Sequence, residues 1–518
     1  MTLKAPRTML FATSLVVTMG ISNADTVASE IAPQTSQVGE FWVAQRMPDF
    51  GSAIIDVEIP ESNQTIADIQ VRFVDDEEST EGKTRDYIIL REFDLEVGDR
   101  YDAELARRGL QRVTNLGIVS SATLTLEPTE DPDAAIMVIT VDEANPFPVA
   151  FGLTLPHPSA LQGPVVPDTV LPGTDRSGGT LLSLSIERRN IGGNNQTAAL
   201  GVEGGANTFN YGFFFTDPWI SGDPNRTGYT VNFFNRREVS TVFDGGDEVE
   251  LSNDRDPWVH RIGGGFDFFR PVSSDLALAA GASFQRVSVR DSLTTDDIFT
   301  EDELGNELTF SDEGRDSLFT LSFAGSLDRR DDRRFPTDGY QLLFRTDQYI
   351  PVGESSIAGN RLTANYTQYL PVPLFGFDDG PRTLIFNVQG GTFIGDLPPY
   401  EAFALGGGTS VRGYDSGEIG SGRSFLQATA EYRFPILDFI AFREEIDVGG
   451  TLFVDYATDL GSGDTVRGEP AEVRDKPGDG LGFGVGLRAL TPIGPARLEL
   501  GINDDGESEV IFTIGDRF

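Results

Sequence analysis

Residues 425 to 434 read FLQATAEYRF, and apolar side chains recur at every second position of this stretch. One face carries Leu426, Ala428, Ala430, Tyr432 and Phe434. The other face carries Gln427, Thr429, Glu431 and Arg433, together with Phe425. Because successive side chains of a strand point to opposite faces, one side of this strand is apolar and the other is polar. The pattern is typical of a transmembrane β-barrel strand, which has lipid on one side and a polar lumen on the other.

The same alternation recurs from about Val149 to Phe518. About sixteen segments begin near residues 149, 178, 196, 207, 226, 256, 275, 316, 338, 357, 382, 422, 446, 480, 496 and 508. Long connections lie near residues 156–177, 241–255, 291–316, 396–422 and 459–480, and most of the others are short turns. An even strand number with long loops on one side and short turns on the other is typical of an outer-membrane barrel. The sequence therefore predicts a mainly β fold, with an antiparallel barrel of about 16 strands over residues 146–518.

Soluble folds offer an alternative, because propellers and stacked β-sandwiches also alternate. They do not explain the C-terminal Phe518, the recurring aromatic residues on one face and the small leading domain together. That domain is predicted over residues 64–145, after a linker over residues 25–63. Its segments follow the order strand, helix, helix, strand, strand, and Asp102 is expected to cap the second helix. This order predicts one small α+β domain.

The N-terminus resembles an export signal. Lys4 and Arg7 precede an apolar run from Met9 to Met19, and Ser22-Asn23-Ala24 supplies small residues for cleavage. A single membrane anchor is the alternative, but the run is too short to cross ~30 Å of hydrocarbon as a helix. We expect residues 1–24 to be a signal peptide that is cleaved near Ala24. The mature chain is then expected in the outer membrane, with its small domain in the periplasm.

Composition argues against several classes of function. The 518 residues include no Cys and two His, His157 and His260, and the formal net charge is −41. A Cys/His zinc site is excluded, and a His-dependent triad is disfavoured. The acidic balance argues against nucleic acid as a partner, because phosphate contacts need clustered Lys and Arg. We find no paired nucleophile and base and no phosphate-binding loop, so we predict no catalysis, cofactor or resident metal. An outer-membrane lipase would need a serine with a basic partner, for which few candidates exist.

A loop motif carries a family resemblance. Residues 406–421 read GGGTSVRGYDSGEIGS, and Val411, Arg412, Gly413 and Tyr414 resemble the V-R-G-[FY] signature of the BamA/TamA-type outer-membrane assembly and translocation pores. Residues 421–435, 451–456, 480–501 and 512–518 resemble the cyanobacterial and chloroplast outer-envelope branch of that superfamily. Residues 82–87, GKTRDY, with Arg91-Glu92, resemble the POTRA domain nearest the barrel. One departure is that a single POTRA is found, whereas assembly and import members carry two or more.

The resemblance implies a role for the loop arginine. In the superfamily this arginine is held inside the barrel by acidic residues of the inner wall. Carried onto this sequence, Arg412 in a loop inserted into the lumen, residues 396–422, would meet Glu431 and Asp455. The alternation supports this placement, because both carboxylates fall on polar faces of predicted strands. The alternative is that Arg412 is an exposed loop charge.

The C-terminus resembles the signal by which outer-membrane barrels are recognised for insertion. Phe518, Ile514, Phe512 and Val510 share one face, although Asp516 stands where an apolar residue is usual. In BamA-type insertases the last strand pairs weakly with the first, which forms a lateral seam. The predicted first strand, residues 149–155, is short and is followed by two prolines, so we expect few hydrogen bonds across this seam.

The function implied by the resemblance is insertion or translocation of other proteins. The partners would be unfolded outer-membrane or secreted clients, outer-membrane lipid and accessory assembly proteins, and the POTRA would dock clients by β-augmentation. The alternative is a passive solute or ion pore, or a structural barrel that retains the fold. The acidic stretch over residues 291–316 is expected to be a solvated extracellular loop, with divalent cation binding as the alternative.

Overall fold

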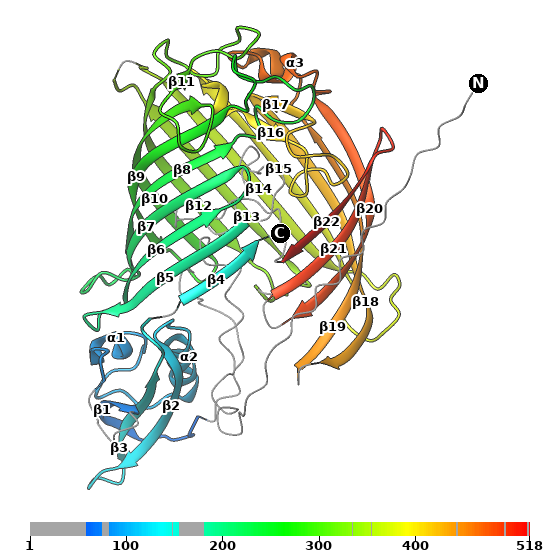
Figure 1. Ribbon diagram of the computed structural model, residues 1–518. Helices are drawn as coiled ribbons and strands as arrows, with labels where there is room; N and C mark the ends of the chain where they lie inside the picture. The colour runs from blue at the N-terminus through cyan, green and yellow to red at the C-terminus, as the bar shows by residue number, and fades with distance from the viewer. Residues whose placement is uncertain are drawn as a thin grey trace, which may run out of the picture.

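The computed structural model describes residues 59–74, 82–147, 149–154, 181–333, 335–353, 355–441, 444–491, 494–514 and 517. The predicted signal peptide, the predicted linker before residue 59 and Phe518 lie outside the described residues. The described chain forms a closed β-barrel with a small α+β domain at one end (Figure 1). None of the helices in these ranges has the length and apolar character needed to cross a bilayer.

The small domain is a three-stranded sheet packed against two helices. Its elements are β1 (Thr65–Val74), α1 (Asp86–Leu90), α2 (Ala103–Thr114), β2 (Val119–Pro128) and β3 (Ala134–Glu143). This is the order expected from the sequence. β3 is the central strand, parallel to β1 and antiparallel to β2. The carboxylate of Asp102 accepts hydrogen bonds from the backbone N–H groups of Glu104 and Leu105 and so caps α2. The buried stripe of α2, which includes Leu110 and Val113, contributes to the domain core.

Within the described residues, sixteen strands close the barrel. They are β4 (Val149–Thr154), β5 (Leu181–Ile191), β6 (Gln196–Gly204), β7 (Thr208–Asp217), β8 (Gly228–Val239), β9 (Trp258–Pro271), β10 (Leu276–Arg290), β12 (Asp316–Asp328), β13 (Gly339–Ile350), β14 (Gly359–Pro371), β15 (Thr383–Gly395), β18 (Ser424–Ala441), β19 (Glu444–Thr458), β20 (Asp479–Thr491), β21 (Gly494–Asn503) and β22 (Ser508–Ile514). Each strand pairs with the next one along the chain, antiparallel throughout. The predicted fold class is confirmed.

The two faces of the strands differ as the alternation requires. In β18, Leu426 is 41% exposed on the outer face, whereas Gln427 and Glu431 are each 1% exposed on the inner face. Aromatic side chains are exposed on the outer face of many strands, and these include Phe213, Phe233, Phe268, Phe323, Phe344, Phe386, Phe483 and Phe512. An apolar, aromatic-rich outer surface is the surface that a barrel presents to lipid.

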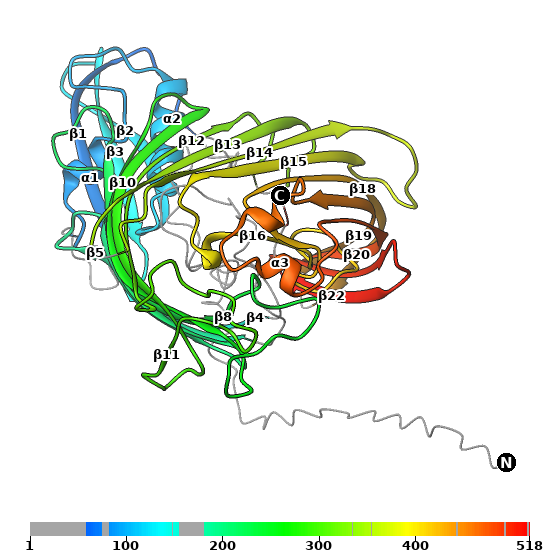
Figure 2. The same ribbon diagram turned by 90° about the horizontal axis from the view of Figure 1, so that it is seen from above.

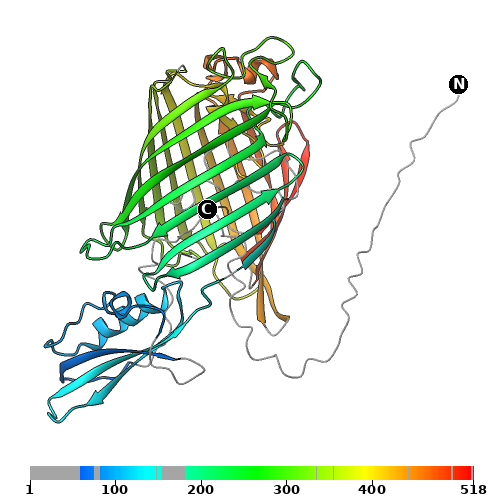
Figure 3. The ribbon, with the colours of Figure 1, turned by 60° about the vertical axis from the view of Figure 1, so that its left-hand side comes forward.

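The two ends of the barrel differ in their connections. Turns at the end beside the small domain are mostly short, such as residues 192–195 between β5 and β6 (Figure 3). The opposite end carries the long connections over residues 240–257, 291–315, 396–423 and 459–478. These contain β11 (Ile298–Phe299), η2 (Pro399–Glu401), β16 (Phe403–Leu405), β17 (Gly420–Gly422), η3 (Gly463–Thr465) and α3 (Pro470–Val473). Figure 2 shows β16 and α3 lying over the barrel interior.

The barrel closes where β22 meets β4. β4 has 6 residues and β22 has 7, whereas every other strand of the barrel has at least 9. Because ladder hydrogen bonds grow in number with paired length, this closure and the β4–β5 pair, both limited by the 6 residues of β4, can hold fewer of them than the other strand pairs.

Candidate functional site

The connection between β15 and β18, residues 396–423, folds into the barrel. β16 and β17 pair as a small hairpin in this connection, and we call residues 406–416, which lie between these two strands, the loop tip. Val411 and Ile419 are completely buried. Phe403 packs on Phe425 of the barrel wall, with ring centroids 4.8 Å apart. The connection therefore fills part of the lumen with packed apolar side chains.

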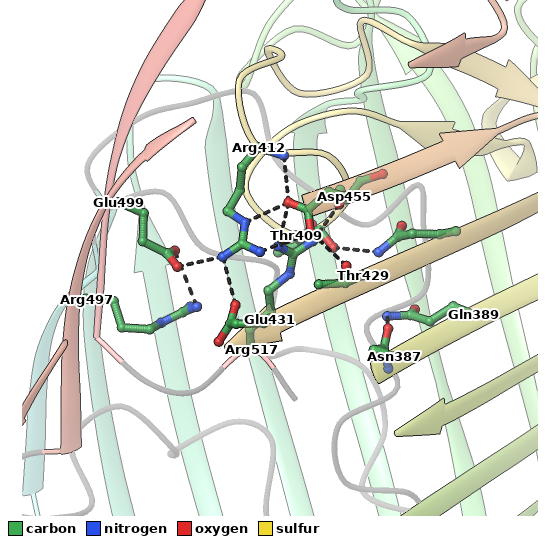
Figure 4. Close-up of polar contacts among 12 residues, drawn as sticks. Asn387, Gln389, Thr409, Arg412, Thr429, Glu431, Asp455, Arg497, Glu499 and Arg517 are labelled. Atoms are coloured by element: carbon green, nitrogen blue, oxygen red, sulfur yellow. Dashed lines mark hydrogen bonds and ion pairs between the residues drawn. The ribbon is translucent and has the colours of Figure 1, made fainter. Parts of the chain in front are cut away.

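Arg412 lies at the centre of a buried ionic cluster (Figure 4). Its Nε donates to Asp455 Oδ2 at 2.7 Å, and a second nitrogen donates to Oδ1 at 3.0 Å. The remaining nitrogen donates to Glu431 at 2.9 Å and to Glu499 at 2.6 Å. The guanidinium also lies 3.3 Å from the ring centroid of Phe453. The structure thus brings together the three predicted residues Arg412, Glu431 and Asp455, and it adds Glu499; we call these four the lock cluster.

The carboxylates of the lock cluster each have a further partner. Thr429 donates to Asp455 at 2.8 Å, Arg433 donates to Glu431 at 2.7 Å, and Arg497 lies 3.5 Å from Glu499. Asp455 and Arg412 are fully buried, and Glu431 and Glu499 are at most 2% exposed. Charges that are this deeply buried are stable only when they are paired and hydrogen-bonded. Loss of one member therefore destabilises the remaining charges of the cluster.

Glycines of β20 and β21 form the surface on which the loop tip lies. A Cβ atom added to Gly501 would lie 2.6 Å from the carbonyl carbon of Arg412 and from the backbone nitrogen of Gly413. A Cβ atom on Gly482 would overlap the carbonyl oxygen of Arg412. Gly413 itself has φ +106, a conformation that L side chains rarely adopt. The tip and the wall therefore approach closely because neither has a side chain at the contact.

Replacing Gly501 with alanine should push the loop tip off the wall, because the contacts that the new methyl group meets are backbone atoms that cannot rotate away. Overpacking of this kind costs about 1–3 kcal/mol. Amide hydrogen exchange over residues 406–416 should rise in this variant. Gly390→Ala is the matched control, since a Cβ atom there meets its nearest atom at 3.4 Å. Equal exchange in the two variants would contradict the close contact.

A second set of charges holds the descending limb of the same connection. Glu401 in η2 is 6% exposed, and its carboxylate accepts from Arg261 of β9. Arg361 of β14 donates to it at 3.2 Å and the Tyr349 hydroxyl of β13 donates at 2.9 Å. We call these four residues the limb anchor. The charges are arranged in the opposite way to those of the lock cluster, because here the loop supplies the carboxylate and the barrel wall supplies the arginines. None of these four residues was predicted from the sequence.

The long connections also hold one another above the lumen. The buried Arg474 donates to the carbonyl oxygens of Phe243 and Val249, each at 2.9 Å. Lys476 donates to the carbonyl oxygen of Asp244 at 2.7 Å and to Ser421 Oγ at 3.1 Å. Burial lowers the pKa of Lys476, and the neighbouring Arg474 adds repulsion. Three connections therefore meet in one hydrogen-bonded cap.

The acidic stretch over residues 291–316 was expected to be a solvated loop, but some of its carboxylates are buried. Asp302 is 6% exposed and accepts hydrogen bonds from the backbone N–H groups of Leu304 and Asn306. Asp316 is fully buried and accepts from the hydroxyl of Tyr400 at 2.7 Å. These carboxylates shape the loop and join it to the lumen connection. The described residues hold no group of three or more His, Cys, Asp or Glu suited to a metal ion.

The small domain contacts the barrel through the stretch that resembled a barrel-proximal POTRA. Arg91 donates to the carbonyl oxygen of Trp219 at 2.9 Å, and its guanidinium lies 4.4 Å from a ring centroid of that indole. Tyr87 donates to Asn194 Oδ1 at 2.9 Å. These contacts join α1 and its flank to the turns after β5 and β7. The domain is therefore held against the rim of the barrel.

The structure describes only part of the predicted insertion signal. Val510 and Phe512 are 67% and 38% exposed on the outer face of β22. Ile514 is the last residue of β22, and Phe518 lies outside the described residues. Recognition of these residues during insertion stays a prediction.

Comparisons with known proteins point in one direction. The sequence model described as the Omp85 superfamily domain matches residues 190–518. The chain is 28% identical to the outer envelope protein 80, chloroplastic, of Arabidopsis thaliana over 487 residues, which cover 92% of this chain and 60% of that protein. It is 27% identical to the protein TOC75, chloroplastic, of Pisum sativum, over 85% of this chain and 54% of that protein. The chain thus spans between half and two thirds of the length of these relatives.

A solved structure shares the fold. The crystal structure of BamA from Haemophilus ducreyi lacking POTRA domains 1–3 matches with a TM-score of 0.59 and 15% sequence identity. The match covers 90% of this chain and 91% of that chain, so the barrel and the small domain are compared together.

Proposed function

Because the chain belongs to the Omp85 superfamily, we propose that it assists the insertion or translocation of client proteins at the outer membrane. The observation that carries the proposal is a lumen occupied by its own loop, held by a charge cluster rather than by covalent bonds. A plug of this kind can be released and restored. The chain is an outer-membrane protein, and the small domain lies on the periplasmic side.

The small domain supplies a docking surface for clients. β3 is the central strand of its sheet, so β1 and β2 are the edges, and an extended client segment can add to an edge strand through main-chain hydrogen bonds. Arg91 and Tyr87 hold the domain against the barrel rim, so a docked client is delivered beside the barrel. Burial of the client's apolar face supplies the free energy of the later steps.

The alternative, a passive solute or ion pore, receives less support. A water-filled pore needs an open lumen, whereas Val411, Phe403, Phe393 and Tyr400 belong to a continuous buried apolar cluster inside this barrel. The cap formed around Arg474 and Lys476 adjoins that cluster, because Arg474 donates to the carbonyl oxygen of Phe243, which is one of its members. Both features oppose a permanently open path.

Depletion of the protein in its native host tests the proposed function. The expected result is that several unrelated barrel proteins fall together in the outer-membrane proteome, and that the wild-type gene restores them. Loss of one exported protein alone would narrow the function to dedicated secretion. An unchanged proteome with altered uptake of small ions would overturn the proposal in favour of the pore.

A further inference from the structure

The penultimate residue of the chain lies in the lumen beside the lock cluster. Arg517 is 3% exposed at its side chain, and one of its nitrogens lies 3.2 and 3.0 Å from the two carboxylate oxygens of Asp455. Another of its nitrogens donates to the carbonyl oxygen of Ser410 in the loop tip. Arg517 lies three positions after Ile514, the last residue of β22, and Figure 4 shows its side chain beside those of Arg412 and Asp455.

Asp455 therefore holds two arginines that come from separate parts of the chain. Arg412 belongs to the loop tip and Arg517 belongs to the segment after β22. Thr429 also donates to the same carboxylate. Since a carboxylate offers about four acceptor positions, both arginines share one limited set of acceptor sites. Whatever moves one guanidinium changes the electrostatic environment of the other.

The loop tip also touches the closing strand directly. A Cβ atom added to Gly408 would lie 3.3 Å from Ile511 Cγ2, and Ile511 is on the inner face of β22 with 9% exposure. β22 is held on one side by β21 and closes on the other side against β4, which has only 6 residues. The loop tip thus lies against a strand with one short ladder.

We propose that Arg517 couples the closing strand to the loop, so that opening of the β22–β4 closure and release of the loop tip are one linked event. Displacing the end of β22 withdraws Arg517 from Asp455 and from Ser410, which loosens the tip. Releasing Arg412 equally loosens the end of β22, because linkage between two sites is reciprocal. The coupling itself does not depend on the proposed function, but its biological role does. In that role, a client strand that displaces β22 also releases the loop from the lumen.

Hydrogen exchange on the purified full-length protein in lipid nanodiscs, without a client, tests the coupling. Arg517→Gln should speed exchange over residues 406–416 by about tenfold, since a sub-global opening tracks the lost interaction. Arg412→Gln should likewise speed exchange over residues 508–514. Arg517→Lys, which keeps the charge, should recover part of the protection. Because no client is present, failure here is distinguishable from failure of the proposed function.

The matched control is Arg345→Gln on β13. Arg345 is another inward-facing arginine, and its partners are Asp347 and Ser322. Its replacement should leave both segments unchanged. An Arg517→Gln variant with normal exchange over residues 406–416 would overturn the coupling. A uniform rise over all strands would overturn it as well, because that result means general destabilisation.

A covalent substitute gives a second measurement. The chain has no cysteine, so a pair introduced by Gly408→Cys and Ile511→Cys can be trapped without competing thiols. The disulfide joins the loop tip to β22 in place of Arg517. In the Arg517→Gln background, oxidation should return exchange over residues 406–416 to the wild-type rate, and reduction should reverse this. If oxidation has no effect, the tether between the strand and the loop is not what protects the tip.

Discussion

Replacing Arg412 with alanine is expected to release the loop tip and to abolish the ability of the gene to rescue a depleted host. The substitution leaves Glu431, Asp455 and Glu499 buried without the guanidinium that neutralises them. Removing one partner of a buried ion pair costs about 3–5 kcal/mol, because the remaining charge stays desolvated. A thiol reagent can report the release, since Ser410→Cys places a cysteine at a position that is 4% exposed in the locked state. Its labelling should accelerate more than about tenfold.

The matched control for this variant is Arg329→Ala. Arg329 pairs with Asp275 at 3.1 Å in a turn region, and its side chain is 56% exposed. Exposed pairs contribute about 0–1 kcal/mol, so labelling at residue 410 and rescue should both be unaffected. If Arg412→Ala labels no faster than this control, the cluster does not hold the loop.

Stability and locking can be separated by removing the whole cluster. A variant with Arg412→Met, Glu431→Gln, Asp455→Asn and Glu499→Gln is combined with Arg433→Gln, Arg497→Gln and Arg517→Gln. It removes the charges of the lock cluster together with the three arginines that pair with its carboxylates. Apolar or neutral replacement of complete buried ion clusters is often close to neutral for stability. We expect this variant to fold more stably than Arg412→Ala and still to fail in rescue. Recovery of function would instead mean that only folding was at stake.

The barrel could be predicted because its strands alternate between a lipid-facing and a lumen-facing side chain, and this alternation is visible in the sequence. Leu426 and Gln427 differ in exposure for a reason that the sequence displays, since apolar residues of their strand recur at every second position with mostly polar residues between them. Glu431 and Asp455 were accessible to the same reasoning, once the resemblance had directed attention to Arg412. Glu499 was accessible too: it lies between Leu498 and Leu500, which are exposed on the outer face, so it had to face the lumen.

Residues outside the strands could not be predicted in this way. Glu401 lies in a connection with no period, and its partners come from β9, β13 and β14, so only the folded chain brings them together. Arg517 follows the last strand, where alternation no longer indicates a direction. The prediction that the acidic stretch over residues 291–316 is fully solvated was wrong for a related reason, because its contacts also form only in the folded chain. Charge density indicates average solvation, but Asp316 is buried and accepts hydrogen bonds from the Tyr400 hydroxyl and from the backbone N–H groups of Phe310 and Ser311.

Replacing Glu401 with glutamine should free the descending limb of the loop while the tip stays held. The change leaves Arg261 and Arg361 without the carboxylate that compensates their charge, again at a cost of about 3–5 kcal/mol. A cysteine at Ala404, which is 5% exposed, should label faster, whereas a cysteine at Ser410 should not. Glu418→Gln is the control from the same loop. The Glu418 carboxylate accepts a hydrogen bond from the backbone N–H of Asp415, within the loop, so its replacement should leave labelling at residue 404 unchanged.

The double variant Arg412→Ala with Glu401→Gln decides whether the loop is held at one point or two. The lock cluster lies on β18, β19 and β21, and the limb anchor lies on β9, β13 and β14, so the two sets share no partner. Independent sites have additive effects on free energy, to within about 0.5 kcal/mol. Additive losses in unfolding experiments would mean that a client must break both attachments to clear the lumen. A double variant no worse than Arg412→Ala would mean that the limb follows the tip, and that Arg412 alone controls the plug.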